Sequence, residues 1–123
     1  SVRNNNIKVE TDLRLSGERH SPETEVAVFR ITKELISNSV RYSGADTISF
    51  SLYPENDDLV LVFSDNGNGF DTETVKKGAG LMNIENRVLA RQGTSEVKSI
   101  SGQGFYFRAH FPFSDKNQKQ QPN

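Results

Sequence analysis

Cysteine and tryptophan are both absent from the 123 residues of the chain. Without cysteine there is neither a disulfide framework nor a thiolate metal site, so the fold must rest on a hydrophobic core. No stretch approaches the roughly 18 consecutive apolar residues that a membrane-spanning helix requires. Neither sign of charge predominates, because the chain has 15 basic and 16 acidic residues and thus a net charge of −1. The composition therefore gives no electrostatic reason to expect a nucleic acid or an anionic membrane as a partner.

The length of the chain and its two ends predict the domain organisation. A chain of 123 residues is typical of one domain, and eight phenylalanines add core volume to an apolar fraction of only 33%. We expect a single domain over residues 1–113 and a disordered tail over residues 114–123, which contain no apolar side chain. The chain begins with Ser1 rather than Met, which favours a fragment excised from a longer protein.

Five segments carry the alternating or continuous apolar patterns of β-strands. The first, residues 7–15, reads as a half-buried strand, and the run LVLVF at 59–63 is apolar on both faces, which predicts a central, covered strand. The last places Phe105, Phe107, Ala109 and Phe111 on one face. The five predicted strands are residues 7–15, 46–54, 59–63, 95–101 and 105–113.

Two helices are expected between these strands. The first begins at Ser21 with Pro22 at its first position, runs to about Tyr42 and is stopped by Gly44. Its predicted buried surface consists of Val28, Phe29, Ile31, Leu35, Ile36 and Val40. The second ends at Gly93, and its predicted apolar face consists of Leu81, Ile84, Val88 and Leu89. The order of elements predicts the α+β class: a two-layer sandwich with helices on one face of a mixed, mainly antiparallel sheet.

The first helix carries a polar stripe near its end. At 100° per residue, Glu34, Asn38 and Arg41 fall within about 60° of one another, and Tyr42 is adjacent. The stripe is either an ordinary solvated face or the wall of a polar pocket. A pocket for a nucleoside triphosphate with magnesium needs such a set: a carboxylate to accept a proton, a neutral oxygen ligand and a cation.

The segment DNGNGF at residues 65–70 also has two interpretations. Asn-Gly after alternating apolar residues is a strong signal for a hairpin turn. Alternatively, Asp65 accepts a hydrogen bond from an exocyclic amine such as that of adenine, while Gly67 and Gly69 let a flat ring lie against the backbone. The segment that follows, DTETVKKGAG, has no strand alternation and argues against the plain hairpin.

A third stretch, GAGLMNIENR, places Gly78 and Gly80 before the second helix. The free N–H groups of a helix N-terminus bind phosphate well. Paired glycines are also common in loops, so this stretch alone does not separate a phosphate site from a plain connection.

Taken together, ELISNSVRYS, DNGNGF and GAGLMNIENR resemble the ATP-binding domain of the family that includes DNA gyrase B, Hsp90, MutL and sensor histidine kinases. They are similar to the N box and the two glycine boxes of that family, and GQGFYFRAHFP is similar to its closing segment. The resemblance covers about residues 7–113 and is strongest to bacterial two-component sensor histidine kinases. The helix beginning GLMNIENRV favours the subgroup whose partners are helix-turn-helix regulators.

This resemblance implies a Bergerat-type α/β sandwich that binds ATP and Mg²⁺ beneath a flexible lid. It assigns Asn38 as the Mg²⁺ ligand, Glu34 as the catalytic base or orienting acid and Asp65 as the adenine-reading acid. Lys76 and Lys77 lie in the lid, where they either reach the phosphates or remain solvated. The remaining positions implied to contact ATP are Arg41, Tyr42, Gly67, Gly69, Gly78, Gly80 and Leu81.

The chain also departs from the family pattern. The closing segment has Phe105 where the family usually has Thr after Gly104, which leaves both residues in doubt as site residues and makes Phe105 a candidate for the core. No helix pair with a phosphoacceptor His is present. His20 lies in a polar loop and His110 faces away from the phenylalanine row, so each is expected to be a surface or structural residue.

The function implied by the resemblance is that of the catalytic domain of a histidine kinase, which transfers the γ-phosphoryl group of ATP to a His on a separate helical dimerisation domain. A response regulator would act downstream, and neither nucleic acid nor direct membrane contact is expected. The domain is expected in the cytoplasm and inactive without its helical partner. Two alternatives remain: a protein serine kinase of the anti-sigma-factor type, and a non-catalytic nucleotide sensor.

Overall fold

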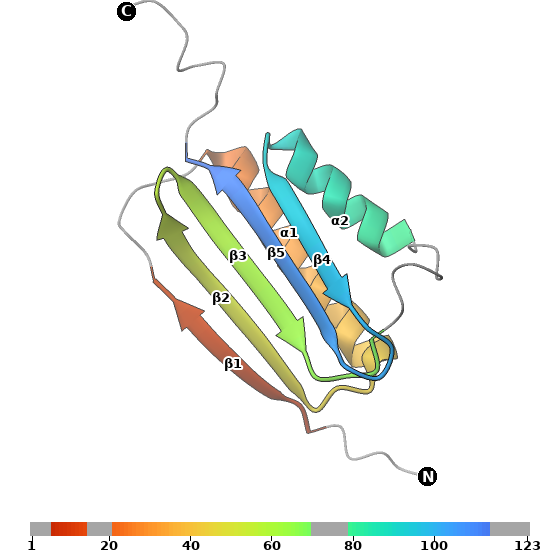
Figure 1. The fold of residues 1–123 in the computed structure, drawn as a ribbon. Coiled ribbons are helices and arrows are strands. Elements are labelled where there is room, and N and C mark those ends of the chain that lie inside the picture. Colours follow the sequence, from red (N-terminus) through yellow and green to blue (C-terminus); the bar gives the residue numbers. More distant parts are fainter. Residues whose placement is uncertain (1–5, 15–20, 70–78, 114–123) are drawn as a thin grey trace, which may run out of the picture.

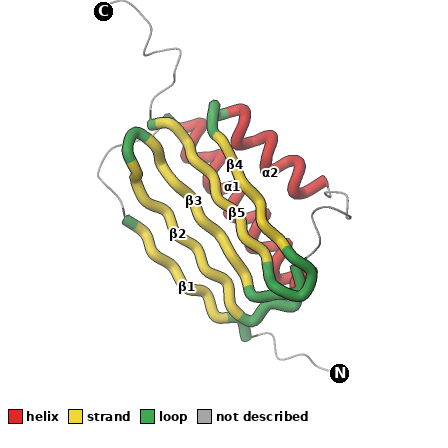
Figure 2. Tube along the Cα trace, viewed as in Figure 1, coloured by secondary structure: helices red, strands yellow, loops and turns green. Residues whose placement is uncertain are grey.

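The computed structural model describes residues 6–14, 21–69 and 79–113. These residues form two layers, in which two helices cover one face of a five-stranded sheet (Figures 1 and 2). The strand order in the sheet is β1-β2-β3-β5-β4. The elements in chain order are β1 Lys8–Leu13, α1 Pro22–Asn38, a π-helical turn Ser39–Ser43, β2 Thr47–Glu55, β3 Asp58–Asp65, α2 Ala79–Ala90, β4 Thr94–Ser99 and β5 Phe105–Pro112.

The sheet is mixed but mainly antiparallel. The pairs β2–β3, β3–β5 and β4–β5 are antiparallel, whereas β1 and β2 are parallel and are joined by a crossover that contains α1. In one cross-strand row, Phe63 lies opposite Phe50 on one side and Phe107 on the other. The predicted α+β class, with helices on one face of a largely antiparallel sheet, is confirmed.

The hydrophobic core lies between the sheet and the helices. Phe107, Ala109 and Phe111 are fully buried there and Phe105 is partly buried, so the predicted phenylalanine row is confirmed. Complete burial of a side chain such as Phe or Ile contributes about 1.5–3 kcal/mol. The largest side chains with no exposed surface are Ile31, Ile48, Val60, Leu61, Phe63, Ile84, Val88, Phe107 and Phe111.

The ends of α1 follow the local sequence signals. The Ser21 hydroxyl accepts a hydrogen bond from the Thr24 N–H at 3.1 Å, and Pro22 follows at the first helical position. Beyond Asn38 the chain continues as the π-helical turn, which ends at Gly44 in the left-handed conformation with φ of 69°. The predicted start and stop are confirmed, but the last turn is wider than an α-helical one.

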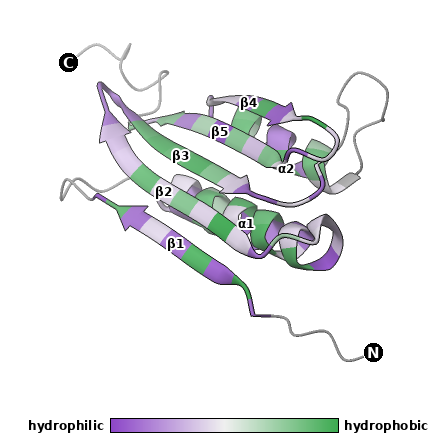
Figure 3. Cartoon of the chain, turned by 60° about the horizontal axis from the view of Figure 1, so that its bottom comes forward, coloured by the Kyte–Doolittle hydropathy of each residue, from purple (hydrophilic) through white to green (hydrophobic). Residues whose placement is uncertain are grey.

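The first strand is not half-buried as predicted. All six residues of β1 are exposed, with Val9 at 52% and Leu13 at 57%, because β1 is an edge strand that pairs with β2 alone. Figure 3 shows the alternation of hydrophilic and hydrophobic residues in β1, in contrast to the mostly hydrophobic β3, which β2 separates from it. Leu15 lies outside the described residues.

Three apolar residues predicted to be buried in the helices are exposed instead: Phe29 at 67%, Val40 at 52% and Leu89 at 65%. Phe29 is two positions from the buried Ile31, which places the two side chains about 200° apart around α1. Val40 belongs to the π-helical turn, and Leu89 is rotated by about 100° from the buried Val88.

Two further predictions are corrected in part. The run LVLVF is central in the sheet, but the described helices cover only one of its faces. Val60 on the other face is nevertheless fully buried, between its register neighbours Tyr53 and His110. Helix α2 ends at Ala90 rather than at Gly93, and the left-handed residue that follows is Gln92 with φ of 63°.

Candidate functional site

The C-terminal part of α1 meets the first turn of α2 at Gly80. A Cβ atom at this position would lie 2.9 Å from Glu34 Oε1 and 3.3 Å from Asn38 Nδ2. The absence of a side chain therefore lets the α2 backbone approach both polar groups closely. The first N–H groups of a helix have no partner within that helix, so a carboxylate, an amide and free N–H donors gather at one place.

Asp65 ends β3, and both of its carboxylate oxygens are held. Oδ1 accepts the Gly67 N–H at 2.9 Å, and Oδ2 accepts the Ser39 hydroxyl at 2.5 Å. Ser39 directly follows Asn38 and is only 3% exposed. This hydrogen bond fixes the orientation of the acid and ties the turn after β3 to the end of α1. Sequence reasoning missed Ser39, because its partner lies 26 residues away.

Gly67 presses the turn after β3 onto the π-helical turn. A Cβ atom here would lie 2.6 Å from Ser43 Cβ and 2.7 Å from Ser43 Oγ. The Asn68 N–H donates to the Ser43 carbonyl at 2.7 Å. The Ser43 hydroxyl in turn donates to the Ser39 carbonyl at 2.7 Å and accepts the Ala45 N–H at 3.0 Å. Ser43 is thus a second residue that the sequence motifs did not single out.

The β4–β5 connection packs against the same turn, and the contact is close because Gly69 of the turn and Gly104 of the connection have no side chains. Both have positive φ, 61° and 92°, and a Cβ atom on Gly104 would lie 2.5 Å from the Asp65 carbonyl oxygen. Gly104 therefore belongs to the support of the turn. Phe105 belongs to the core, where its ring lies edge-on to that of Phe63 at 6.3 Å.

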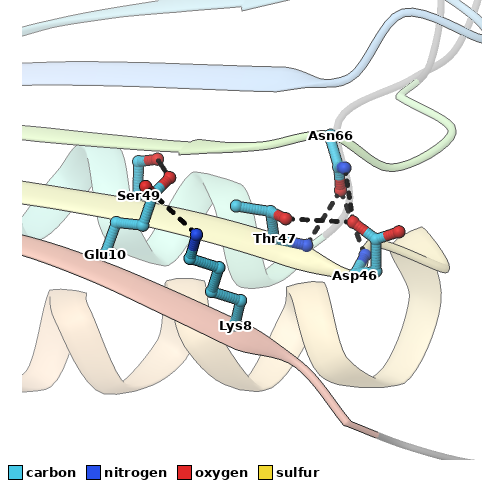
Figure 4. A network of polar contacts seen from close by, with 6 residues as sticks. All are labelled: Lys8, Glu10, Asp46, Thr47, Ser49 and Asn66. Carbon is cyan, nitrogen blue, oxygen red and sulfur yellow. Dashed lines mark hydrogen bonds and ion pairs between the residues drawn. The ribbon is translucent and has the colours of Figure 1, made fainter.

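Asn66 fastens the turn to the beginning of β2 (Figure 4). Its Oδ1 accepts the N–H groups of Asp46 and Thr47, each at 3.0 Å, and its Nδ2 donates to Asp46 Oδ1 at 2.6 Å. Hydrogen bonds from Asn66 and Thr47 lower the pKa of the Asp46 carboxyl below its ordinary value of 3.8. The described part of DNGNGF, residues 65–69, is therefore not a hairpin turn, because β3 pairs with β2 and β5 and the next described element in the chain is α2. The side chains of Asp65 and Asn66 hold these residues in place.

Other predicted site residues are not brought into this group. Arg41 and Tyr42 lie in the π-helical turn and are exposed, Tyr42 at 74%, and no described contact joins them to Glu34 or Asn38. Leu81 is 8% exposed and belongs to the buried face of α2. Gly78, the two lid lysines and His20 lie outside the described residues.

His110 lies on the face of the sheet opposite the helices, as its place beside the phenylalanine row predicted. Its Nδ1 is 3.5 Å from Asp58 Oδ2, and its Nε2 accepts a hydrogen bond from Arg108 Nε at 3.1 Å. His110 pairs in register with Val60, far along β3 from Asp65. It is therefore a structural residue of the sheet surface.

The described residues contain no group of three or more His, Cys, Asp or Glu side chains that could hold a metal ion. The place where Glu34 and Asn38 of α1 meet Gly80 of α2 is called the rim below. A divalent cation at the rim would depend on one or two protein oxygens together with phosphate and water oxygens, which is the ligand set that Mg²⁺ accepts. The Asn38 amide beside Gly80 fits such a partial set. No helix among the described residues is long and apolar enough to cross a membrane.

The sandwich and its rim define a class of protein. A helix end, a glycine-rich turn and the N-terminus of a second helix meet at one end of an α/β sandwich, as in ATPases of the Bergerat type. The sequence of residues 23–115 matches the family described as "Histidine kinase-, DNA gyrase B-, and HSP90-like ATPase". The chain belongs to that family.

Two individual relatives show which members of the family the chain resembles. The chain is 32% identical over 117 residues to the signal transduction histidine-protein kinase/phosphatase DegS of Bacillus subtilis, which covers 89% of this chain and 30% of DegS. It is 32% identical over 91 residues to the sensor protein VraS of Staphylococcus aureus, covering 73% of this chain and 26% of VraS. The chain thus spans less than a third of the length of these relatives.

Solved structures share the fold. The histidine kinase AdeS of Acinetobacter baumannii superposes with a TM-score of 0.74 at 22% identity, over 89% of this chain and 56% of AdeS. The blue-light activated histidine kinase EL346 of Erythrobacter litoralis gives a TM-score of 0.72 at 16% identity, over 92% of this chain and 37% of that protein. The predicted two-layer sandwich is the fold of these domains.

Proposed function

We propose that this chain is the ATP-binding catalytic domain of a sensor histidine kinase, formed by residues 1–113 with residues 114–123 as a tail. In the whole protein it would transfer the γ-phosphoryl group of ATP to a His on a separate helical dimerisation domain, upstream of a response regulator. The observation that carries the proposal is the meeting of Glu34 and Asn38 with the first turn of α2 across Gly80. The sensor and histidine kinase names of the relatives support it over the anti-sigma-factor alternative.

Asp65 is the proposed reader of adenine. One lone pair of each carboxylate oxygen is used by Gly67 N–H and the Ser39 hydroxyl, and a carboxylate offers about four acceptor sites in all. The remaining sites can accept the exocyclic amine. Gly67 and Gly69 would line the adenine site through their backbone, because the lack of side chains lets the turn pack closely against Ser43 and the β4–β5 connection beside Asp65.

The rim at Gly80 is the proposed phosphate end of the site. Free N–H groups in the first turn of α2 favour anionic oxygens, and Gly78, Gly80 and the backbone of Leu81 would lie along them. Arg41 and Tyr42 are exposed on the neighbouring turn, from which they could close on the nucleotide. The lid lysines, Lys76 and Lys77, remain candidates for the same role.

Asn38 is the proposed ligand of Mg²⁺, which when bound would neutralise charge on the phosphates. Glu34 is the proposed catalytic residue, because it lies at the phosphate end beside Gly80. It would accept a hydrogen bond from the incoming imidazole and orient its attacking nitrogen. In the transfer, a P–N bond forms to that nitrogen while the bond from the γ-phosphorus to the bridging oxygen breaks and ADP leaves. Most of the catalysis would come from positioning and from charge neutralisation.

Calorimetric titration with ATP and ADP, each with and without Mg²⁺, tests the nucleotide site. Asp65→Asn should weaken binding by roughly tenfold or more, because a hydrogen bond to a charged group is lost. Asn38→Ala should mainly remove the dependence on Mg²⁺. Asp57→Asn, in the turn between β2 and β3, is the matched control and should bind as the original chain does. Absence of nucleotide binding by the unaltered chain would overturn the proposal.

Transfer is tested separately, by adding a helical phosphoacceptor domain from a related histidine kinase. Glu34→Gln should bind ATP normally but lose phosphoryl transfer to that domain. Normal transfer by Glu34→Gln would remove this residue from the catalytic role. If no supplied domain is phosphorylated although ATP binds, the chain is better described as a nucleotide sensor.

A further inference from the structure

A groove runs between the two helices at the end opposite Gly80. Helices α1 and α2 are antiparallel, because Glu34 and Asn38 of α1 lie at the start of α2 whereas Thr24 contacts Arg91 after the end of α2. The groove has a volume of about 370 Å³. It is lined by Pro22, Glu23, Val26, Ala27, Arg30, Arg87, Ala90 and Arg91.

Charge around the groove is one-sided. The lining contains three guanidinium groups and one carboxylate, although the chain as a whole has a net charge of −1. Arg91 already has a structural role, since it donates to Thr24 Oγ1 and to Ser21 Oγ, both at 3.3 Å, and so braces the start of α1. Arg30 and Arg87 are exposed, and neither forms an ion pair or a side-chain hydrogen bond with any described residue. Two charges are therefore available to a partner.

The floor between these arginines is apolar. Val26 is 49% exposed, Ala27 is 8% exposed and Ala90 is exposed on the α2 side. Phe29 lies three residues beyond Val26 and extends the apolar surface along α1 with 67% of its surface exposed. A small inorganic anion would gain nothing from this floor, whereas an apolar side chain flanked by carboxylates would use both the floor and the arginines.

We propose that this groove docks an acidic amphipathic helix of a protein partner. The valley between two antiparallel helices accepts the ridge of a third helix, with interaxial distances of about 8–10 Å. A leucine-sized side chain would insert over Val26 and Ala27, while carboxylates on its flanks would pair with Arg30 and Arg87. The groove begins at the N-terminal end of α1 and reaches Arg30, one helical turn before Glu34. A helix that docks over Val26 and Ala27 would leave the rim at Gly80 open. The inference rests on none of the nucleotide chemistry proposed above.

Two synthetic peptides of about 15 residues, the length at which helices begin to form, provide the probe. One carries Leu at positions i, i+3 and i+7 with Glu on both flanks, and the other has Lys in place of every Glu. Fluorescence titration of this chain should show the acidic peptide binding about tenfold more tightly than the basic one, with the difference shrinking as salt is raised. Equal affinity for both peptides would overturn the proposal.

Charge reversal makes the test specific to the groove. The double variant Arg30→Glu/Arg87→Glu should invert the preference, so that the basic peptide binds more tightly. Lys98→Glu, an exposed cation of β4 that lies over the Tyr106 ring on the face of the sheet opposite the helices, is the matched control and should keep the original preference. Circular dichroism would confirm that the variants are folded. An unchanged preference in the folded double variant would show that the arginines do not select the partner and would refute the proposal.

Amide shift mapping by NMR locates the peptide. Shifts should concentrate at residues 22–30 and 87–91 and should be absent around Asp65 and Gly67, and Val26→Asp should weaken binding by about tenfold. Vesicles containing phosphatidylglycerol serve as the competing probe. Binding to the vesicles that depends on Arg30 and Arg87, with no binding of the acidic peptide, would replace the protein partner by an anionic lipid surface.

Discussion

The turns that follow the neighbouring strands β2 and β3 contain similar residues but have different roles in the fold. The turn between β2 and β3 consists of Asn56 and Asp57, with Asn56 in the left-handed conformation at φ of 55°. Neither side chain forms a hydrogen bond with a described residue, and the turn is held to the rest of the fold through its backbone, where the Asp57 carbonyl accepts the Phe113 N–H at 3.0 Å. After β3, by contrast, Asp65 and Asn66 direct their side chains inward to Ser39 and Asp46. Each turn contains an adjacent Asn and Asp, so the two sequences are alike, and the difference lies in the residues that the second turn contacts.

The largest expected effect comes from adding a side-chain atom at Gly67, where the turn after β3 packs against the π-helical turn. Gly67→Ala places a Cβ atom 2.6 Å from Ser43 Cβ, so the turn must move away from the π-helical turn, at a cost of about 3 kcal/mol in the free energy of unfolding. Urea unfolding measures this loss. Gly102→Ala is the control: with φ of 81° and no atom within 4 Å of an added Cβ, it should cost only about 1 kcal/mol. Equal losses at the two glycines would mean that packing against Ser43 does not hold the turn.

An intermediate effect is expected when the acid loses its hydroxyl partner. Ser39→Ala removes a partly buried hydrogen bond to a carboxylate and should lower the free energy of unfolding by about 2 kcal/mol. It should also weaken nucleotide binding, because Asp65 would then be oriented by the Gly67 N–H alone. Ser37→Ala, two residues earlier in α1, should change neither quantity measurably. A Ser39→Ala variant with unaltered stability and affinity would limit the hydrogen bond to a passive contact.

The smallest expected effect contrasts the two asparagines directly. Asn66→Gly loses the hydrogen bonds to Asp46 and Thr47 and should lower the free energy of unfolding by about 1.5 kcal/mol. The loss is small for three hydrogen bonds because all of them are exposed to solvent. Asn56→Gly should stay within about 0.5 kcal/mol of the original chain, since glycine adopts positive φ without strain. Thermal or urea unfolding of the pair would show whether the second turn is fastened by its side chains. Similar values for both substitutions would erase the distinction between the turns.

Local signals in the sequence predicted most of the framework. Ser21, Pro22 and Gly44 set the start and the end of the first helical segment, and the alternation around Phe107 placed the core face of β5. These signals succeed because capping, left-handed backbone and the two-residue repeat of a strand are decided within a few positions. The sequence also singled out Glu34 and Asn38, which the fold brings to Gly80.

Exposure and long-range hydrogen bonds could not be predicted in this way. Phe29 and Leu89 are apolar but exposed, because a helical repeat defines directions around the axis and only the packed neighbours decide which directions are covered. Val9 is exposed because β1 is at the edge, which depends on strand order. The bond from Ser39 to Asp65 joins residues that become neighbours only when α1 packs on the sheet.

The π-helical turn Ser39–Ser43 has a consequence for how this helix end can change over evolutionary time. A π-helical turn behaves as an α-helix with one additional residue accommodated in a single turn. Deleting one residue there would restore the ordinary spiral, so that side chains within the turn change direction by up to about 100° around the axis while the residues after Gly44 keep their places. Arg41 and Tyr42 would then face a different neighbour, while Asn38 and everything before it would stay in place. A single-codon deletion that retains Ser39 and Ser43, the residues in contact with Asp65 and Gly67, is thus a minimal genetic step that re-aims these two side chains.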